Sequence, residues 1–329
     1  MCFLRSFLAI TCVVFGLTVQ ATAEDNPGAW LRPIFGNRQP QATYQSRGWF
    51  SANVRNQPTR LNMVEQQVNI TVPLMQNQDR EWSLSARLGQ TDIHSRARLL
   101  DAGQMLPRDL WDVGLSTTYR FKTGDKSIAG FNLGLSSPSD KPFDSVHEID
   151  VQGNVFYRLP TGDRDAWVFM VNYASNRSFA RNVPLPGVAY EWNPAGSMNA
   201  MLGVPFSSVR WRPFERMTLN ARYLLPRTLH AKASYDIGSE CTLFGAFDWT
   251  SRRWFRHDRT DNDHSLEYWE KRLEAGLVWQ PTQNVSLTLS GGYAFNRFFY
   301  EGDGYRDRAD NRINLDDGPF VGLRLAVRF

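Results

Sequence analysis

The residues best suited to covalent chemistry are the five histidines and the serines that could act with them. A serine nucleophile needs a neighbouring base that takes its proton at neutral pH. The nearest arrangement is Tyr173-Ala174-Ser175-Asn176, in which Tyr173 stands where the base would be needed. A phenol, with a pKa of about 10, is a poor base at pH 7. No histidine has a serine at a recognisable spacing, so we predict no enzymatic activity and no catalytic residue.

Two acidic runs are the candidates for metal binding. One holds His257, Asp258, Asp261, Asp263 and His264, and the other holds Asp303, Asp307, Asp310, Asp316 and Asp317. Carboxylates ligate calcium, but neither run has the spacing of an EF-hand loop, and arginines interrupt both. We therefore predict solvated loops, no metal site and no cofactor. A second interpretation is that guanidinium groups here bind lipopolysaccharide phosphates; the arginines concerned are Arg252, Arg253, Arg256 and Arg259.

A period of two in polarity predicts the elements that must position these side chains. At the C-terminus the apolar residues are Val321, Leu323, Leu325, Val327 and Phe329, and the residues between them are Gly322, Arg324, Ala326 and Arg328. Such alternation is typical of a strand with one apolar and one polar face. It recurs in residues 64–74, 82–88, 113–121, 149–157, 217–223, 229–235 and 285–295. We predict an all-β fold.

The connections between the strands indicate how the sheet is closed. Short turns rich in Gly, Pro, Asn and Asp alternate along the chain with connections that are usually longer, such as 91–109, 252–265 and 301–317. Short turns on one rim and long loops on the other are typical of a transmembrane antiparallel up-and-down β-barrel. The segments number sixteen, and fourteen fits nearly as well because Pro205 interrupts residues 198–211. We expect about 14–16 strands, with twelve as a further option.

Composition supports a membrane barrel over a soluble sandwich. The mean hydropathy is −0.42, yet 13% of residues are aromatic and 11 are Trp. Tyr157, Trp192, Trp211 and Trp279 each precede a turn proline, where amphipathic rings suit the headgroup layer. The formal net charge of +4 is too small to indicate nucleic-acid binding. Only Cys241 follows the N-terminal segment, so we expect no internal disulfide.

The N-terminus predicts export. Arg5 precedes the 13-residue apolar run Phe7–Val19, and Ala21-Thr22-Ala23 follows it. The run is shorter than the roughly 20 residues of a membrane-spanning helix, so it indicates a cleaved signal peptide. We predict a signal peptide at 1–23, a short periplasmic arm at 24–41, and an outer-membrane barrel at 42–329, in contact with outer-membrane lipid.

Two stretches carry a resemblance to known proteins. The terminal Phe329, with Val327 on the same alternating strand, resembles the assembly signal of bacterial outer-membrane barrels, although Gly322 lies two residues earlier than the usual glycine. This resemblance implies a barrel-assembly machinery as partner. Residues 184–190, 203–205 and 212–216 resemble an uncharacterised outer-membrane barrel family of unknown function. The second resemblance implies the fold and no activity.

The polar faces carry the candidate functional residues. If the apolar residues face lipid, the lumen lining is predicted to include Glu148, Asp150, Arg158, Arg210, Arg212, Arg222, Glu270, Arg272, Glu274, Arg324 and Arg328. An arginine-rich pore lining favours anions. The equal alternative is an ion-pair network that fills a narrow barrel, because buried charges are tolerated when they are paired or wet.

Three functions follow in order of preference. The first is a passive channel or small-solute transporter with an arginine-rich lumen. The second is a structural or adhesion barrel with a plugged lumen, whose extracellular loops bind a partner. The third and weakest is a barrel lipid hydrolase. Whether the lumen is open or filled discriminates between the first two.

Overall fold

The computed structural model of the chain describes residues 35–99, 103–124, 126–177, 180–225, 228–304, 307–309 and 312–329. The predicted signal peptide and most of the predicted arm lie outside these residues and stay predictions. The helical elements among the described residues are two single 3₁₀ turns, η2 (Val146–Glu148) and η3 (Asp307–Ala309). No helix in this part of the chain is long and apolar enough to cross a membrane.

All other regular elements are strands, as the period of two predicts. They are β1 (Gln41–Asn53), β2 (Arg60–Gln76), β3 (Arg80–Ser95), β4 (Asp109–Lys122), β5 (Ile128–Ser139), β6 (Asp150–Thr161), β7 (Asp165–Ala174), β8 (Leu185–Ala195), β9 (Met198–Val204), β10 (Phe206–Phe214), β11 (Met217–Leu224), β12 (Thr228–Asp236), β13 (Cys241–Trp254), β14 (Ser265–Thr282), β15 (Val285–Gly302), β16 (Arg312–Leu315) and β17 (Gly318–Arg328). The prediction of an all-β fold is confirmed.

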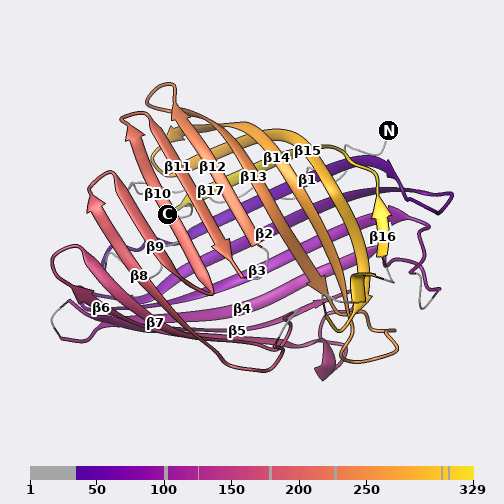
Figure 1. Cartoon of the computed structure of the whole chain (residues 1–329), viewed down its shortest axis with the longest axis horizontal. Coiled ribbons are helices and arrows are strands. Elements are labelled where there is room, and N and C mark those ends of the chain that lie inside the picture. The colour runs from indigo at the N-terminus through magenta and orange to yellow at the C-terminus, as the bar shows by residue number, and fades with distance from the viewer. Residues whose placement is uncertain are drawn as a thin grey trace.

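The strands close into a barrel (Figure 1). Each strand of the wall pairs antiparallel with its neighbours in sequence, and β1 pairs with both β2 and β17. The short β16 lies between the end of β15 and Val54 just after β1, in the same place in the ring as β17, so the 17 described strands form a wall of sixteen positions. The predicted count of sixteen is confirmed. The option of twelve is wrong, because each alternating segment has hydrogen-bonded neighbours on both sides, and Pro205 separates β9 and β10 as distinct paired strands.

Neighbouring residues on a strand face opposite sides of this wall. On β17, Phe320 is 1% exposed and Val321 is 53% exposed. The same contrast runs round the barrel, where Leu115, Leu133, Val155 and Leu273 are among the exposed apolar side chains. A side chain excluded from the interior of a closed barrel is on its outer face. The outer face is therefore apolar.

The four turn-associated aromatic residues lie on this outer face. Tyr157, Trp192, Trp211 and Trp279 are each about two-fifths exposed, and each lies near a short turn at the end of the barrel that holds the start of β1 and the end of β17. Phe329 donates its backbone N–H to the carbonyl of Pro40, which brings the C-terminus beside the start of β1. This end of the barrel corresponds to the predicted periplasmic side.

The wall is much taller on one side than on the other. β14 and β15 have 18 residues each, whereas β9 to β12 have between seven and nine. A tilted strand crosses a bilayer with about 9–11 residues, so β14 and β15 extend beyond the membrane on the extracellular side. On that side two connections are short, contrary to the general pattern: residue 205 alone joins β9 to β10, and residues 225–227 join β11 to β12.

Candidate functional site

Ten of the eleven predicted lumen residues lie on strands, on the face opposite the exposed apolar side chains. Arg222, Arg272, Glu274 and Arg324 line one internal cavity, and Asp150 lines a second. The other five are placed by the alternation of faces along a strand, since each is an even number of residues from an inward-facing residue. They are Arg158, Arg210, Arg212, Glu270 and Arg328. Glu148 lies in η2, inside the extracellular loops, and is 3% exposed.

The cavity nearer the start of β1 and the end of β17, which we call the chamber, has a volume of about 390 Å³. It lies against β1, β11 to β15 and β17. The prediction omitted four of its charged or titratable residues, which are Arg47, His230, Lys232 and Asp248. All four occupy inward positions of the period-two pattern. The alternation of inward and outward positions along each strand was therefore a sufficient signal to find them.

The chamber's two carboxylates already have partners. Asp248 contacts Nδ1 of His230 at 2.5 Å and accepts a hydrogen bond from Arg272 at 3.0 Å. Glu274 lies 3.7 Å from a guanidinium nitrogen of Arg47. The negative charges lining the chamber are thus held by its own cations.

Three side chains separate the chamber from a second cavity. Arg47 lines the chamber, whereas Glu65 and Arg252 line the second cavity, of about 330 Å³. Arg252 Nη2 lies 2.5 Å from Glu65 Oε2, and Arg47 Nη1 lies 3.8 Å from the same oxygen. Because β2 and β13 are not neighbours in the wall, the Glu65–Arg252 pair joins separate parts of the lumen. We call this cluster, which joins residues of the two cavity linings, the constriction.

Arg252 lies on a strand, whereas the sequence pattern predicted it in a loop. The sequence pattern assigned residues 252–265 to a loop, but β13 continues to Trp254 and places Arg252 in the lumen. The other three arginines of this group also bind carboxylates: Arg253 pairs with Glu267, Arg256 with Glu301 and Arg259 with Glu148. Each of the four arginines therefore has a carboxylate partner within the protein, and binding of lipopolysaccharide phosphates by them stays a prediction.

The extracellular end of the lumen is filled by side chains and loops, which together we call the plug. Its core includes Trp49, Leu61, Leu106, Trp254 and Phe299, all at most 5% exposed. Leu106 comes from the β3–β4 loop, and the others come from strand ends. The loops therefore supply apolar side chains to positions above the polar inner face of the wall.

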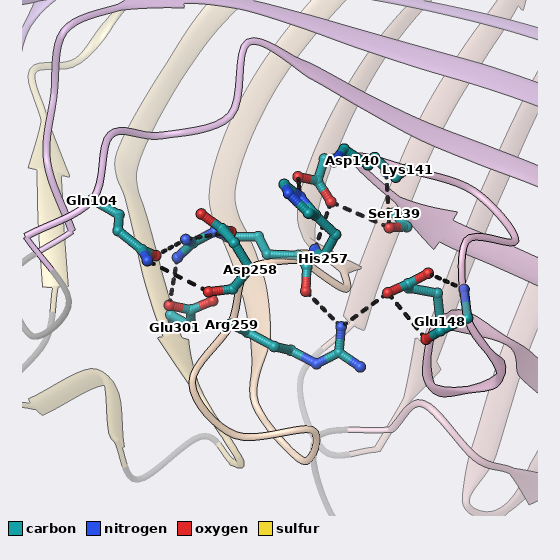
Figure 2. Close-up of polar contacts among 11 residues, drawn as sticks. Gln104, Ser139, Asp140, Lys141, Glu148, His257, Asp258, Arg259 and Glu301 are labelled. Carbon is teal, nitrogen blue, oxygen red and sulfur yellow. Dashed lines mark hydrogen bonds and ion pairs between the residues drawn. The ribbon is translucent and has the colours of Figure 1, made fainter.

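The β13–β14 loop crosses the plug and is anchored on the far side of the barrel (Figure 2). Phe255 forms a parallel bridge with Ser139 at the end of β5. Asp140 accepts hydrogen bonds from the backbone N–H of His257 at 2.8 Å and contacts its ring Nδ1 at 2.7 Å. β5 and β13 lie on opposite sides of the ring of strands, so this loop is a strap across the mouth.

Buried ion pairs hold the strap down. Arg256, whose side chain is 1% exposed, donates to Glu301 Oε2 at 2.8 Å and to Asp258 at 2.6 Å. Burial raises the pKa of Glu301, and the charge of Arg256 opposes that shift. Arg259 donates to the carbonyl oxygens of Arg256 and His147, and burial lowers its pKa. The strap is therefore packed and hydrogen-bonded.

Asp140, His257 and Asp258 have potential ligand atoms within 4.8 Å of one another. A histidine with two carboxylates is a donor set that suits zinc. Their donor atoms are nevertheless engaged, since His257 contacts Asp140 and Asp258 accepts from Arg256. A guanidinium at hydrogen-bond distance opposes a cation in the same place. The contacts of Asp140, His257 and Asp258 therefore anchor the strap.

A chain of polar contacts links the chamber to the plug. Arg272 bridges Asp248 in the chamber and Glu270, whose Oε1 it approaches to 2.5 Å. The other oxygen of Glu270 accepts from Trp49 Nε1 and from the Tyr268 hydroxyl, both at 2.9 Å. Arg272 and Glu270 were predicted lumen residues, and Trp49 and Tyr268 belong to the plug core.

The remaining predicted residues belong to other parts of the inner face. Arg158 donates to Glu191 at 2.7 Å. Next to this pair lies an apolar cluster of Ile128, Phe156, Val168, Ala189 and Met201, against which Phe35 of the arm packs. Ser175, considered as a nucleophile, instead donates to Asp150 at 2.8 Å and accepts from the backbone of Val151. That arrangement anchors a loop.

A closed antiparallel wall with an apolar exterior, aromatic residues near one rim and a charged interior defines a bacterial outer-membrane β-barrel. No protein-family model matches the chain, and no curated protein sequence matches it. The proposed resemblance of residues 184–216 to an uncharacterised family thus stays a prediction.

Solved structures with a similar fold are themselves outer-membrane proteins. They include the COG4313 outer membrane channel from Pseudomonas putida F1, with 11% identity, a TM-score of 0.41, and coverage of 92% of this chain and 99% of the other. A FadL homologue from Pseudomonas aeruginosa has 12% identity, a TM-score of 0.40, and coverage of 93% and 94%. Omp33 of Acinetobacter baumannii has 11% identity, a TM-score of 0.37, and coverage of 88% and 98%. At these scores the superpositions carry no functional information.

Proposed function

We propose that the protein is a passive outer-membrane channel or small-solute transporter with an arginine-rich lumen, closed at its extracellular end in the conformation described. The observation that carries this proposal is the chamber, an internal cavity of about 390 Å³ lined by charged side chains. Beyond it, the second cavity continues toward the outside, and the constriction of Arg47, Glu65 and Arg252 stands between them. A lumen with no transport role would gain stability if apolar side chains filled such space.

The charged lining fits this role. Five of the predicted lumen residues line the two cavities, each of which is large enough for several waters of about 30 Å³. We propose no catalytic role for any of them. Recognition of Val327 and Phe329 by a barrel-assembly machinery is part of the same proposal, and lipopolysaccharide is a further proposed partner.

One specific observation favours the second function, a structural or adhesion barrel. The strap and the plug core close the extracellular mouth with buried ion pairs, including Arg256–Glu301 and Arg259–Glu148. A permanently closed barrel would present its loops to a partner without passing solutes. The two functions differ in whether the strap opens.

Single-channel recording in planar bilayers tests the choice. The variants are the parent chain, a chain with residues 256–263 of the strap replaced by a Gly/Ser linker, and a control with the same replacement at the β12–β13 turn, residues 237–240. We expect strap replacement to raise conductance strongly, with the control like the parent, because the loop blocks the path. A folded strap variant that conducts no better than the parent would support the structural role.

A further inference from the structure

Five cationic side chains line the chamber, from Arg47, Arg222, Lys232, Arg272 and Arg324, against two anionic ones, Asp248 and Glu274. We propose that the chamber is a binding site for a small oxyanion, a carboxylate or a phosphate. This proposal rests on the proposed channel function and names its substrate class.

The first support is the local charge balance. The lining has a surplus of three positive charges, before any protonation of His230. Asp248 is already held between His230 and Arg272, and Glu274 lies beside Arg47. Cations in a cleft with low-dielectric walls raise the local concentration of anions. The chamber therefore attracts anions more strongly than its two carboxylates repel them.

The second support is the direction from which the donors come. The cationic residues lie on β1, β11, β12, β14 and β17, five strands of one continuous arc of the wall, and because the inner face of this arc is concave their side chains approach the cavity from several directions. Neutral polar residues also line the cavity, namely Gln45, Ser46, Asn220, Thr288 and Ser290. An oxyanion accepts hydrogen bonds on several sides at once, and guanidinium groups match a carboxylate or a phosphate with two parallel bonds.

The third support is size. At about 390 Å³ the chamber lies near the lower end of the usual range of ligand pockets, roughly 300–1,000 Å³. Few apolar side chains line it, and Phe244 is the largest of them. The site thus suits a compact, polar anion. A long acyl chain would find little apolar surface there.

Calorimetric titration of the refolded full chain in zwitterionic detergent tests the proposal. The probes are inorganic phosphate and succinate, with neutral succinamide as the matched control, all at low and constant ionic strength because salt screens the attraction. We expect phosphate and succinate to bind and succinamide to give no saturable heat. Equal binding of succinamide and succinate would overturn the assignment to anions.

A pair of substitutions locates the binding. Arg222→Gln combined with Lys232→Gln removes two of the chamber's cations, and we expect it to weaken phosphate binding at least about tenfold. Arg80→Gln, at the exposed first residue of β3, is the matched control and should bind like the parent. Heat-modifiable migration on gels verifies that each variant folds. If the double variant does not fold, Arg222→Lys with Lys232→Arg keeps the charge and must retain binding. Unchanged phosphate affinity in a folded double variant would refute the proposed binding site.

The test separates this proposal from the channel itself. Conductance of the strap variant in potassium chloride depends on an open path and not on oxyanion binding. A conducting barrel without phosphate or succinate binding would keep the channel and refute the site. Saturable binding in a barrel that never conducts would keep the site and refute transport.

Discussion

The extracellular and periplasmic halves of the lumen are built on one continuous inner face but have different interiors. In the plug, Leu61, Trp254 and Phe299 pack together, and charged groups such as Arg256 are paired and dry. In the chamber, Arg222 and its neighbours face a cavity. Strand periodicity is the same in both halves. The difference arises because the loops cover only the extracellular half. The strand position therefore determines which way a side chain points, and the loops determine what surrounds it.

The same substitution should destabilise the protein strongly in the plug and hardly at all in the chamber, and this is the largest effect we expect. Arg256→Met removes the partner of the buried Glu301 and of the more exposed Asp258, so it should cost about 3–5 kcal/mol of stability. Arg222→Met, in the chamber, should change stability by no more than about 0.5 kcal/mol, because its side chain is exposed. Urea unfolding in vesicles, followed by tryptophan fluorescence, measures both. Similar costs would show that the chamber is as tightly packed as the plug.

In the chamber half, only the inner face of the wall should tolerate substitutions of this kind. Leu325 faces outward and its neighbour Arg324 lines the chamber. Leu325→Arg should cost roughly 2–4 kcal/mol, the penalty for arginine facing lipid near mid-membrane. Arg324→Leu should leave insertion nearly unchanged. Refolding titrations into phospholipid vesicles compare the two, and the reverse order of costs would invert our assignment of faces.

The wall could be predicted from sequence because period two is a local property. Residues such as Val321 and Leu325 indicate their face without knowledge of any partner strand. The predicted even strand count and the inward position of Arg272 and Arg324 followed from the same pattern. Loop length predicted the rims, except where β9–β10 and β11–β12 have short connections.

The plug and the constriction could not be predicted because they depend on contacts between residues distant in sequence. Phe255 meets Ser139 across the mouth, and Arg252 meets Glu65 across the lumen. Nothing in the local sequence of the β13–β14 loop distinguishes a strap from a solvated loop, since its charged residues are typical of both. The alternation along β12 and β13 could have identified His230 and Asp248 as inward-facing. Predicting that they pair would also have required the register between the two strands.

Trp49 lies where the two halves meet, so its hydrogen bond tests how dry that boundary is. Trp49→Phe keeps most of the ring packing but removes the N–H that donates to Glu270. We expect a cost of about 1.5–3 kcal/mol, as for a bond to a charged group. Trp82→Phe is the matched control, because its N–H donates to the neutral hydroxyl of Thr117 on the outer face. Its expected cost is about 0.5–1.5 kcal/mol. Urea unfolding measures both, and equal costs would show that water already reaches Glu270.

The smallest effect we expect is a pH dependence that distinguishes the dry plug from the wet chamber. Burial raises the pKa of Glu301, which lies at the extracellular end of β15, and Arg256 partly offsets that shift. A carboxyl whose pKa is higher in the folded state binds protons more readily there than in the unfolded chain. Its contribution to folding therefore becomes more favourable as pH falls through the folded pKa, and this gain is complete below the unfolded value of about 4.3.

Glu301→Gln isolates this contribution, because the other titrating groups of the plug, such as His257 and Asp258, are present in both chains. We expect the stability of the parent relative to the Gln variant to rise as pH is lowered from 7.5 to 5, measured by urea unfolding at each pH. A difference that stays flat would show that Arg256 balances the cost of burial. A difference that falls on acidification would show that Arg256 overcomes it and holds Glu301 ionised. In either case the plug would tolerate a buried carboxylate as well as the chamber does, and the contrast between the two halves would rest on packing alone.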